Sequence, residues 1–348
     1  MITKGRSTRS NNIYHDLKIN TFDCFSPKMF KKLSYFDLVI VHCLDVYKFI
    51  LITFAPVGVK FAWIGWGTDY YGYIYDNEDY LFLPSTLSIR KVFKKKLFYV
   101  FLNPILCLKS CLIGFIDFVF KVHALKRIAS FSPVLSNEYT LMQSTGLISH
   151  LPPLIPWNYG SLEENLVANF LDERINGDSI LIGNSSSLTN NHVDAFEQIQ
   201  RAYSTINLSA KIIVPLSYGD ESYRKLICEK GISLFGDRFI PLVKFMAIDE
   251  YVSFLKQIGF AIMNHKRQQG VGLIIILLYL GARLFLRDDS PTYKMLISNG
   301  AILNSINELE KSPELLKTPL CDYEIKTNIE VLNMHWSKKA IDLKTKNL

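Results

Sequence analysis

The sequence predicts an α/β protein with two doubly wound parallel-sheet domains that face a cleft. Short apolar runs rich in β-branched residues alternate with helix-length segments in both halves of the chain, which is the pattern of β-α-β units. A proline-rich stretch at 151–156 separates the two halves. The length of 348 residues suits two domains of about 150 residues each. In such sheets, ligands bind beyond the carboxyl ends of the strands.

The first half contains three strand patterns and one clear helix pattern among them. The run 36–42 is short, apolar and contains β-branched residues, which is typical of a buried parallel strand, and 59–64 and 128–132 predict two further short strands. The segment 44–54 fits a helix. We expect this half, residues 1–150, to form the first domain.

The second half repeats the alternation more clearly. Strands are predicted at 180–183, 211–215, 232–235, 260–264 and 283–286, with helices that begin near 191, 221, 249 and 272. We therefore expect a linker over 151–178, a second domain over 179–330 and a helical tail over 331–348.

The positive charge is concentrated in the first third of the chain. Residues 1–127 hold 18 of the 39 Lys and Arg but 9 of the 32 Asp and Glu, which indicates an anionic partner for this part. No nucleic-acid motif accompanies the basic residues, so nucleic acid is not expected. The first twenty residues are polar and do not predict a signal peptide.

The segment 97–120 is apolar and rich in Phe and Leu, and a basic cluster at 90–96 precedes it. This order is typical of a helix that lies in the interface of an anionic membrane leaflet. A buried helix and a true membrane span are the alternatives. Lys109 and Asp117 weigh against a span, because each charge costs roughly 3 kcal/mol at a bilayer centre.

The strongest chemical signal is the loop 265–272, which follows a predicted strand and opens an apolar helix. Two cations and two glycines beside a helix N-terminus predict a cradle for a diphosphate, because the helix end presents amide groups and a positive dipole. The alternative is a solvated loop whose glycines serve packing. The candidate donor-binding residues are Lys266, Arg267, Gln268, Gln269, Gly270 and Gly272.

A second signal follows the first strand of the same domain. Small hydroxyl and amide groups at a strand's carboxyl end suit hydrogen bonds to phosphate or sugar, although Asn and Ser are also plain turn formers. The residues of this group are Gly183, Asn184 and Ser185, with Asn190 and His192 just beyond. Pro215 and Tyr218, after the next strand, are candidates to border a base or ribose.

A third signal is the stretch WIGWGTD at 63–69, at the end of a predicted strand. Aromatic faces stack on sugar rings, and Asp69 is placed to take a proton from a bound hydroxyl. Trp66, Thr68 and His42 are the candidate acceptor-binding residues. The alternative is two core tryptophans and a helix-capping aspartate. No His, Cys, Asp or Glu cluster has metal-ligand spacing, so no metal or cofactor is expected.

Five stretches carry a resemblance to a known family. They are FAWIGWGTDYY (61–71), ILIGNSSSLTNNHVDAF (180–196), KIIVPLSYGDESY (211–223), the region 231–257 and HKRQQGVGLIIILLYLG (265–281). In this order they resemble the TDP-N-acetylfucosamine:lipid II N-acetylfucosaminyltransferases of enterobacterial common antigen synthesis.

The resemblance implies a GT-B fold, with two Rossmann-like domains, and an inverting, metal-independent transfer of a 4-acetamido-4,6-dideoxygalactose-type sugar from a dTDP donor. The acceptor would be an undecaprenyl-diphosphate-linked saccharide at the cytoplasmic face of the bacterial inner membrane, where the protein would be peripheral. The second domain would hold the donor, and the first would hold the acceptor. From the residues themselves, we expect Asp69 to be the general base. Two alternatives are a GT-B transferase that uses another nucleotide sugar for O-antigen assembly and a non-catalytic scaffold of the assembly complex.

Overall fold

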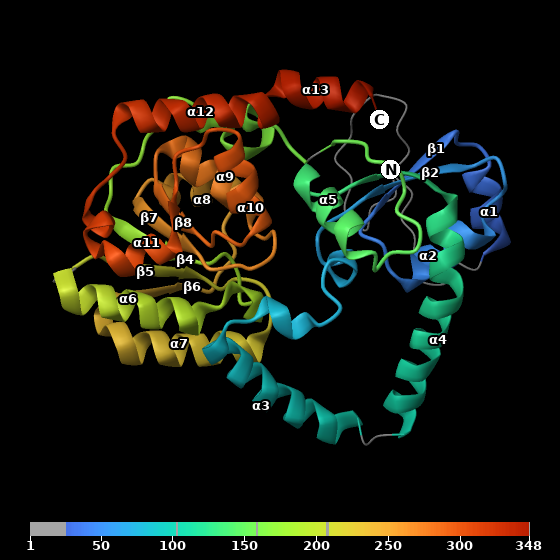
Figure 1. Cartoon of the computed structure of the whole chain (residues 1–348), viewed down its shortest axis with the longest axis horizontal. Helices are drawn as coiled ribbons and strands as arrows, with labels where there is room; N and C mark the ends of the chain where they lie inside the picture. Colours follow the sequence, from blue (N-terminus) through green and yellow to red (C-terminus); the bar gives the residue numbers. More distant parts are fainter. Residues whose placement is uncertain (1–25, 102–103, 158, 207–208, 348) are drawn as a thin grey trace. The chain divides into compact units, whose positions relative to one another are not determined.

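The computed structural model describes residues 26–101, 104–157, 159–206 and 209–347 (Figure 1). The expectation for the first twenty residues lies outside these ranges. The chain divides into two compact units. The first holds residues 1–77 and 94–158 with the last two residues, and the second holds residues 78–93 and 159–346.

The first unit is built on a parallel sheet of three strands in the order β1-β2-β3, among the residues that the structure describes. The strands are β1 (Leu38–His42), β2 (Lys60–Ile64) and β3 (Ile128–Ser132), so all three strand predictions for this half are confirmed. The helices are α1 (Pro27–Leu33), α2 (Val46–Phe54), α4 (Pro104–Arg127) and α5 (Ser136–Thr145).

Helix α4 packs on α2 through its C-terminal half. The rings of Phe54 and Phe120 lie 5.4 Å apart, centroid to centroid. The guanidinium of Arg127 donates hydrogen bonds to the carbonyls of Ile52, Thr53 and Ala55 at 2.6–2.9 Å. Because the last carbonyls of a helix have no intrahelical donor, Arg127 satisfies the C-terminus of α2 and anchors the base of α4.

The apolar segment 97–120 is divided between two helices. Helix α3 (Pro84–Phe101) ends within this segment, and α4 begins at Pro104. Within the described ranges, no helix combines the length and the apolar character needed to cross a membrane. The side chains of α4 that remain exposed are nevertheless apolar at Leu108, Leu112, Phe115 and Phe118.

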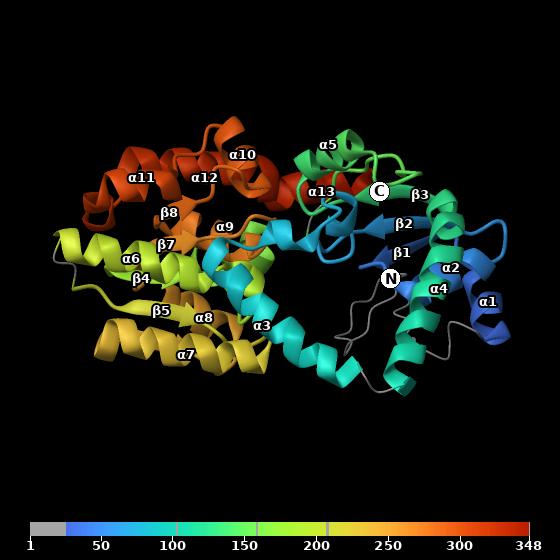
Figure 2. The same ribbon diagram turned by 60° about the horizontal axis from the view of Figure 1, so that its bottom comes forward.

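The second unit contains a parallel sheet of six strands in the order β6-β5-β4-β7-β8-β9 (Figure 2). The strands are β4 (Ser179–Ile182), β5 (Ile212–Pro215), β6 (Phe239–Leu242), β7 (Ile258–Met263), β8 (Arg283–Leu286) and β9 (Asn304–Ser305). The order reverses between β4 and β7, which are neighbours paired in register at Leu181 and Ala261. This is the doubly wound arrangement that the sequence predicts.

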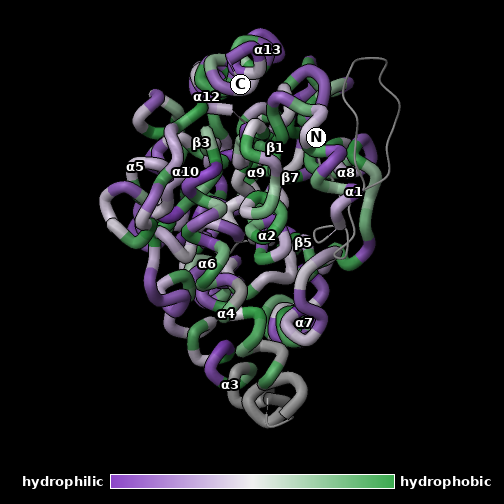
Figure 3. The backbone as a smooth tube through the Cα atoms, turned by 90° about the vertical axis from the view of Figure 1, so that its right-hand side faces the viewer, coloured by the Kyte–Doolittle hydropathy of each residue, from purple (hydrophilic) through white to green (hydrophobic). Residues whose placement is uncertain are grey.

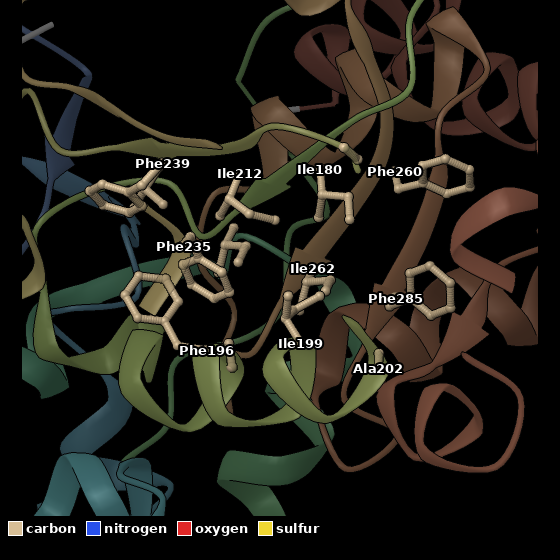
Figure 4. Packing of buried hydrophobic residues seen from close by; sticks show 14 of the residues in the cluster. Ile180, Phe196, Ile199, Ala202, Ile212, Phe235, Phe239, Phe260, Ile262 and Phe285 are labelled. Atoms are coloured by element: carbon tan, nitrogen blue, oxygen red, sulfur yellow. The ribbon is translucent and has the colours of Figure 1, made fainter. Parts of the chain in front are cut away.

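Helices cover both faces of this sheet. On one face, α6 (His192–Ile206), α7 (Glu221–Phe235) and α11 (Ile306–Lys311) enclose the main core (Figure 4). Phe196 and Ile199 of α6 point toward Ile180, Ile212 and Ile262 of the strands. The other helices of the unit are α8 (Ile248–Leu255), α9 (Val271–Leu280), α10 (Pro291–Ser298), α12 (Asp322–Trp336) and α13 (Lys338–Lys346).

Helix α9 is apolar along its length (Figure 3). Its side chains from Leu273 to Leu280 are all buried. It lies between the sheet and α12, on the side opposite α6 and α7 (Figure 1). A helix that is hydrophobic all round requires cover on every side, and the sheet and α12 supply it. The N-terminus of α9 is thereby fixed at the carboxyl edge of the sheet.

The strand predicted at 232–235 is wrong, because these residues form the last turn of α7. The buried positions Tyr223, Ile227, Gly231 and Phe235 recur every four residues, which is a helical stripe. A Cβ atom at Gly231 would stand 2.2 Å from the ring of Phe239, so the glycine lets α7 approach the next strand. The strand itself, β6, lies at Phe239–Leu242, and the short β9 was not predicted.

The segment Glu78–Phe93, predicted within the first domain, packs instead in the second unit. The carboxylate of Asp194 on α6 accepts hydrogen bonds from the amides of Ser85 and Thr86 at 2.9 and 3.0 Å. These amides belong to the first turn of α3, where a carboxylate cap is favourable. The predicted linker likewise contributes its short helices 162–166 and 168–170 to this unit.

Candidate active site

Two predicted loops meet at the point where the strand order of the second unit reverses. Gly183 follows β4, and His265 lies two residues beyond the end of β7. Because β4 and β7 are adjacent parallel strands, both loops leave the same edge of the sheet. This switch point is where doubly wound sheets bind their ligands.

Hydrogen bonds join the two loops to each other. The side-chain oxygen of Asn190 accepts from the amide of Asn184 at 2.8 Å and lies 2.8 Å from Nε2 of His265. The amide nitrogen of Asn190 donates to the carbonyl of Ser185 at 2.9 Å. Gln269 closes the contact by donating to Oδ1 of Asn184 at 2.9 Å. The loops 183–190 and 265–270 therefore form one polar network.

Two glycines allow the loops to approach. Gly183 and Gly270 have φ values of +70° and +65°, a conformation that other residues adopt at a cost. A Cβ atom at Gly183 would stand 2.7 Å from both Asn190 Oδ1 and His192 Nε2. Gly270 also precedes α9, whose first-turn amide groups have no acceptor within the helix. The sequence signal for a helix N-terminus beside this loop is confirmed.

A pocket of about 300 Å³ opens at this edge of the sheet. It is bordered by the ends of β4, β5 and β6 and by the first turn of α9. Five of the thirteen predicted donor-binding residues line it: Asn184, Pro215, Tyr218, Gly270 and Gly272. The other eight do not line it: Gly183, Ser185, Asn190, His192, Lys266, Arg267, Gln268 and Gln269.

The rest of the pocket wall was not predicted. These residues are Ser217, Leu242, Lys244, Phe245, Met246, Tyr251 and Leu273. Most of them come from β6 and from the loop and helix that follow it. With the strand at its true position, 239–242, the rule that ligands bind beyond strand carboxyl ends would have pointed to 243–246.

Asn190 and His192, predicted near the donor, are fully buried behind the β4 loop. Burial lowers the pKa of His192 to about 3, and burial together with the nearby Arg267 lowers the pKa of His265 to about 3. Both imidazoles are therefore neutral at pH 7. In this structure they support the loop through hydrogen bonds and packing rather than offering charge to a ligand.

The two predicted cations follow β7 at the same edge. Nζ of Lys266 lies 3.8 Å from the centroid of the Tyr80 ring, a cation–π contact within the second unit. Burial lowers the pKa of Lys266, and the neighbouring Asp289 opposes that shift. Arg267 is half-buried beside it, and Gln268 is buried. A cation of partly reduced hydration is suited to binding an anionic group.

In the first unit, Asp69 lies in the loop after β2 and holds the loop together. Its Oδ2 accepts from the amide of Leu44 at 2.9 Å and from the indole of Trp63 at 2.7 Å, and its Oδ1 accepts from the amide of Trp66 at 2.8 Å. Burial raises the pKa of Asp69, although these hydrogen bonds oppose the shift. Asp69 thus joins the carboxyl ends of β1 and β2.

The other predicted acceptor residues surround this carboxylate. Trp66 and Thr68 are exposed, whereas Trp63 is a core residue, so only one of the two tryptophans presents its face to solvent. His42 ends β1 and is buried, and burial lowers its pKa. The structure brings Trp66, Thr68 and Asp69 together in one loop at the carboxyl edge of this sheet.

Comparisons with known proteins agree with this architecture. Residues 162–313 match the family described as 4-alpha-L-fucosyltransferase, glycosyl transferase group 56. The matched range covers both loops of the polar network and the pocket wall between them.

Solved structures of distant relatives share the fold. The α,α-trehalose 6-phosphate synthase of Burkholderia multivorans is 8% identical with a TM-score of 0.55, over 93% of this chain and 73% of that one. HepE of Anabaena, solved with UDP and glucose, is 10% identical with a TM-score of 0.56, over 92% and 79%. Sucrose-phosphate synthase of Thermosynechococcus elongatus is 11% identical with a TM-score of 0.55, over 93% and 75%.

At such low identity these structures establish the fold, and the family match establishes the enzyme class. The parallel sheets, the switch-point loops and these matches together indicate a glycosyltransferase of GT-B fold, in which residues 162–313 match the model of glycosyl transferase group 56.

Proposed function

We propose that this enzyme transfers a deoxyamino sugar of the 4-acetamido-4,6-dideoxygalactose type from dTDP to an undecaprenyl-diphosphate-linked saccharide. The pocket beyond the ends of β4, β5 and β6, which Asn184 and Gly270 of the two hydrogen-bonded loops line beside the N-terminus of α9, is the observation that carries the donor half of the proposal. The family description names a fucosyl transfer, and fucose is a 6-deoxyhexose like the proposed sugar. HepE, of the same fold, was solved with UDP and glucose.

The departing diphosphate is the group that needs stabilisation. During transfer the acceptor hydroxyl oxygen forms a bond to the anomeric carbon, and the bond from that carbon to the diphosphate oxygen breaks with its electron pair. Lys266, Arg267 and the amides at the start of α9 would receive the developing negative charge. No metal is required in this scheme, because two cations and a helix dipole supply the positive potential.

Asp69 is the proposed general base. It would take the proton of the acceptor hydroxyl as that oxygen attacks, and the attack from the face opposite the diphosphate inverts the anomeric configuration. A fixed carboxylate with a raised pKa suits this role, because raised basicity strengthens proton transfer. Trp66 offers an exposed aromatic face on which an acceptor sugar would stack.

The acceptor lipid requires contact with a membrane surface, and α4 offers it. Its exposed apolar side chains include Leu112, Phe115 and Phe118, with Phe118 79% exposed, and Lys126 lies in its last turn. Apolar side chains near basic ones suit an anionic leaflet. Arg90, by contrast, is buried and paired with Glu78 and Asp79, so it does not belong to this surface. We propose a peripheral position at the cytoplasmic face of the inner membrane.

Vesicle co-sedimentation tests this surface. Wild-type protein should bind vesicles that contain anionic phospholipid, and the double variant Phe115→Ser/Phe118→Ser should lose most of that binding, because each buried Phe contributes about 1.5–3 kcal/mol. The control Tyr323→Ser/Met334→Ser removes two exposed apolar side chains from α12 and should bind as wild type. Equal binding of all three proteins would contradict a role of α4.

The donor and acceptor are tested by incubating the enzyme with a panel of dTDP-sugars and membrane lipid-linked acceptor, and reading the product by mass. Thermal stabilisation by dTDP, UDP and GDP in parallel identifies the nucleotide. Stabilisation by UDP or GDP alone would favour a transferase that uses another nucleotide sugar for O-antigen assembly. No stabilisation by any of the three would favour a non-catalytic scaffold.

A further inference from the structure

The segment Glu78–Phe93 lies far in sequence from the donor loops, yet it packs within the same unit. Its apolar side chains Ile89 and Phe93 pack against the core of the second unit. Arg90 is buried and donates to Glu78 at 2.6 Å, with its guanidinium 4.4 Å from the ring centroid of Phe82. The segment is therefore fixed in place by its own ion pairs and by the core, as a built part of this unit.

Asn191 connects this segment to the donor loops. Its side-chain oxygen accepts from the amide of Leu83 at 2.9 Å, and its amide nitrogen donates to the carbonyl of Leu81 at 3.2 Å. The same amide nitrogen donates to the carbonyl of Asn264 at 3.0 Å, and Asn264 immediately precedes the loop 265–270. Asn191 is buried and has a φ of +52°, a left-handed conformation that Asn adopts more readily than most residues other than glycine.

Tyr80 makes the second connection. The centroid of its ring lies 3.8 Å from Nζ of Lys266. Tyr80 directly precedes Leu81, whose carbonyl accepts the hydrogen bond from Asn191. A lysine side chain has four rotatable bonds, and holding its ammonium in one place has an entropic cost that the aromatic face offsets. The ring contacts the ammonium without cancelling its positive charge, on which the neighbouring Asp289 and Arg287 also act.

We propose that Tyr80 is a positioning residue of the donor site, which holds the Lys266 ammonium at the carboxyl edge of the sheet for contact with the donor's diphosphate. The inference rests on the proposed function, because it requires that a nucleoside diphosphate binds there. The segment Glu78–Phe93 would then serve the donor site by presenting the face of a phenol ring, because neither the loop 183–190 nor the loop 265–270 contains a tyrosine or phenylalanine.

Titration of dTDP into the purified full chain tests the proposal. Tyr80→Leu should weaken dTDP binding about two- to five-fold, the range expected for loss of one cation–π contact. Tyr80→Phe keeps the ring and should bind dTDP as wild type. Tyr323→Leu, which removes an exposed tyrosine from α12, is the matched control and should also leave binding unchanged.

A double-mutant cycle separates positioning from general loss of structure. If Tyr80 acts through Lys266, then Lys266→Met/Tyr80→Leu should bind dTDP no more weakly than Lys266→Met alone. Additive losses, or unchanged binding by Tyr80→Leu, would overturn the proposal. If the wild-type chain binds none of dTDP, UDP and GDP, the proposed function itself fails and the role of Tyr80 falls with it.

Discussion

The proposed donor region of the second unit and the proposed acceptor region of the first unit, called the donor and acceptor regions below, both lie at the carboxyl edge of a parallel sheet, but they are built differently. In the donor region, hydrogen bonds of Asn190 and Gln269 connect two loops that are distant in the sequence. In the acceptor region, one carboxylate, Asp69, gathers the backbone amides of Leu44 and Trp66. One region is a network between loops, and the other is organised by a single residue.

This difference teaches how each region should respond to change. A single neutral hydrogen bond of the network contributes about 1 kcal/mol, so the loss of one bond should weaken the ligand site by a small factor. A single organising carboxylate concentrates both structure and chemistry in one position. Substitutions in the acceptor region should therefore act in an all-or-none manner, and those in the donor region should act by degrees.

The largest effect is expected for Asp69→Asn. Loss of the base should lower the transfer rate by about 10²–10⁴ while dTDP binding stays close to wild type, because the donor pocket is in the other unit. The pH dependence of the wild-type rate tests the same role. Because burial raises the pKa of Asp69, the wild-type transfer rate should still rise with pH above the range in which an ordinary aspartate titrates.

The control for this variant is Asp45→Asn, which alters an exposed carboxylate at the N-terminus of α2 in the same unit. It should retain transfer. Single-turnover rates and dTDP titrations on both variants distinguish the outcomes. Full transfer activity of Asp69→Asn would remove Asp69 as the base and leave it only its role in holding the loop.

A smaller effect is expected for Arg267→Ala in the donor region. A charged hydrogen bond to a diphosphate contributes about 1.5–3 kcal/mol, so kcat/KM for the donor should fall by about 10–100-fold. Arg201→Ala, which removes an exposed arginine from α6, should leave the reaction unchanged. Near-normal transfer by Arg267→Ala would show that the cradle is assigned to the wrong residues.

The two regions also differ in how far the sequence predicts them. Strand positions in both were predictable where the strand is short, apolar and contains β-branched residues, as at Leu38–His42 and Ile258–Met263. The donor loops were predictable because cations, amides and glycines follow a strand end. The strand prediction at 232–235 was wrong because a short apolar run alone does not distinguish a strand from the buried stripe of a helix.

Contacts between distant parts of the chain were not predictable. Nothing in the sequence of Glu78–Phe93 shows that Asp194 and Asn191 bind its backbone, because a backbone amide carries no residue-specific signal. The same holds for Gln269, whose partner Asn184 is 85 residues away. The sequence predicts which chemical groups a loop contains, whereas the fold decides which groups meet.

The buried histidines predict a pH dependence of stability that belongs to the donor region. His192 and His265 have a folded pKa of about 3 against about 6.5 when unfolded, so only the unfolded chain takes up their protons as the pH falls from 7 to 5. Each of the two histidines should therefore lower the free energy of unfolding by about 2 kcal/mol between pH 7 and pH 5. This stability is present above the unfolded pKa of about 6.5 and is lost as the pH falls below it.

Denaturation midpoints at pH 7, 6 and 5 measure this loss. His265→Gln keeps a donor for Asn190 and should reduce the decrease by about 2 kcal/mol, whereas His150→Gln, in an exposed loop, should leave it as in wild type. An unchanged pH dependence in His265→Gln would mean that this imidazole accepts a proton in the folded protein.

The smallest effect is expected for Gln269→Leu, and it asks most directly whether the donor loops act as one unit. The substitution removes the hydrogen bond to Asn184 and the acceptor for the hydroxyl of Thr189, at a cost of about 1 kcal/mol, or roughly five-fold in dTDP affinity. Gln200→Leu, at an exposed position of α6, should have no effect. If the loops are coupled, Asn184→Ala should add little to Gln269→Leu, because both variants break the same contact. Fully additive losses would mean that each loop binds the nucleotide independently. The donor and acceptor regions would then differ in how many residues contact the ligand, and not in whether hydrogen bonds couple the loops.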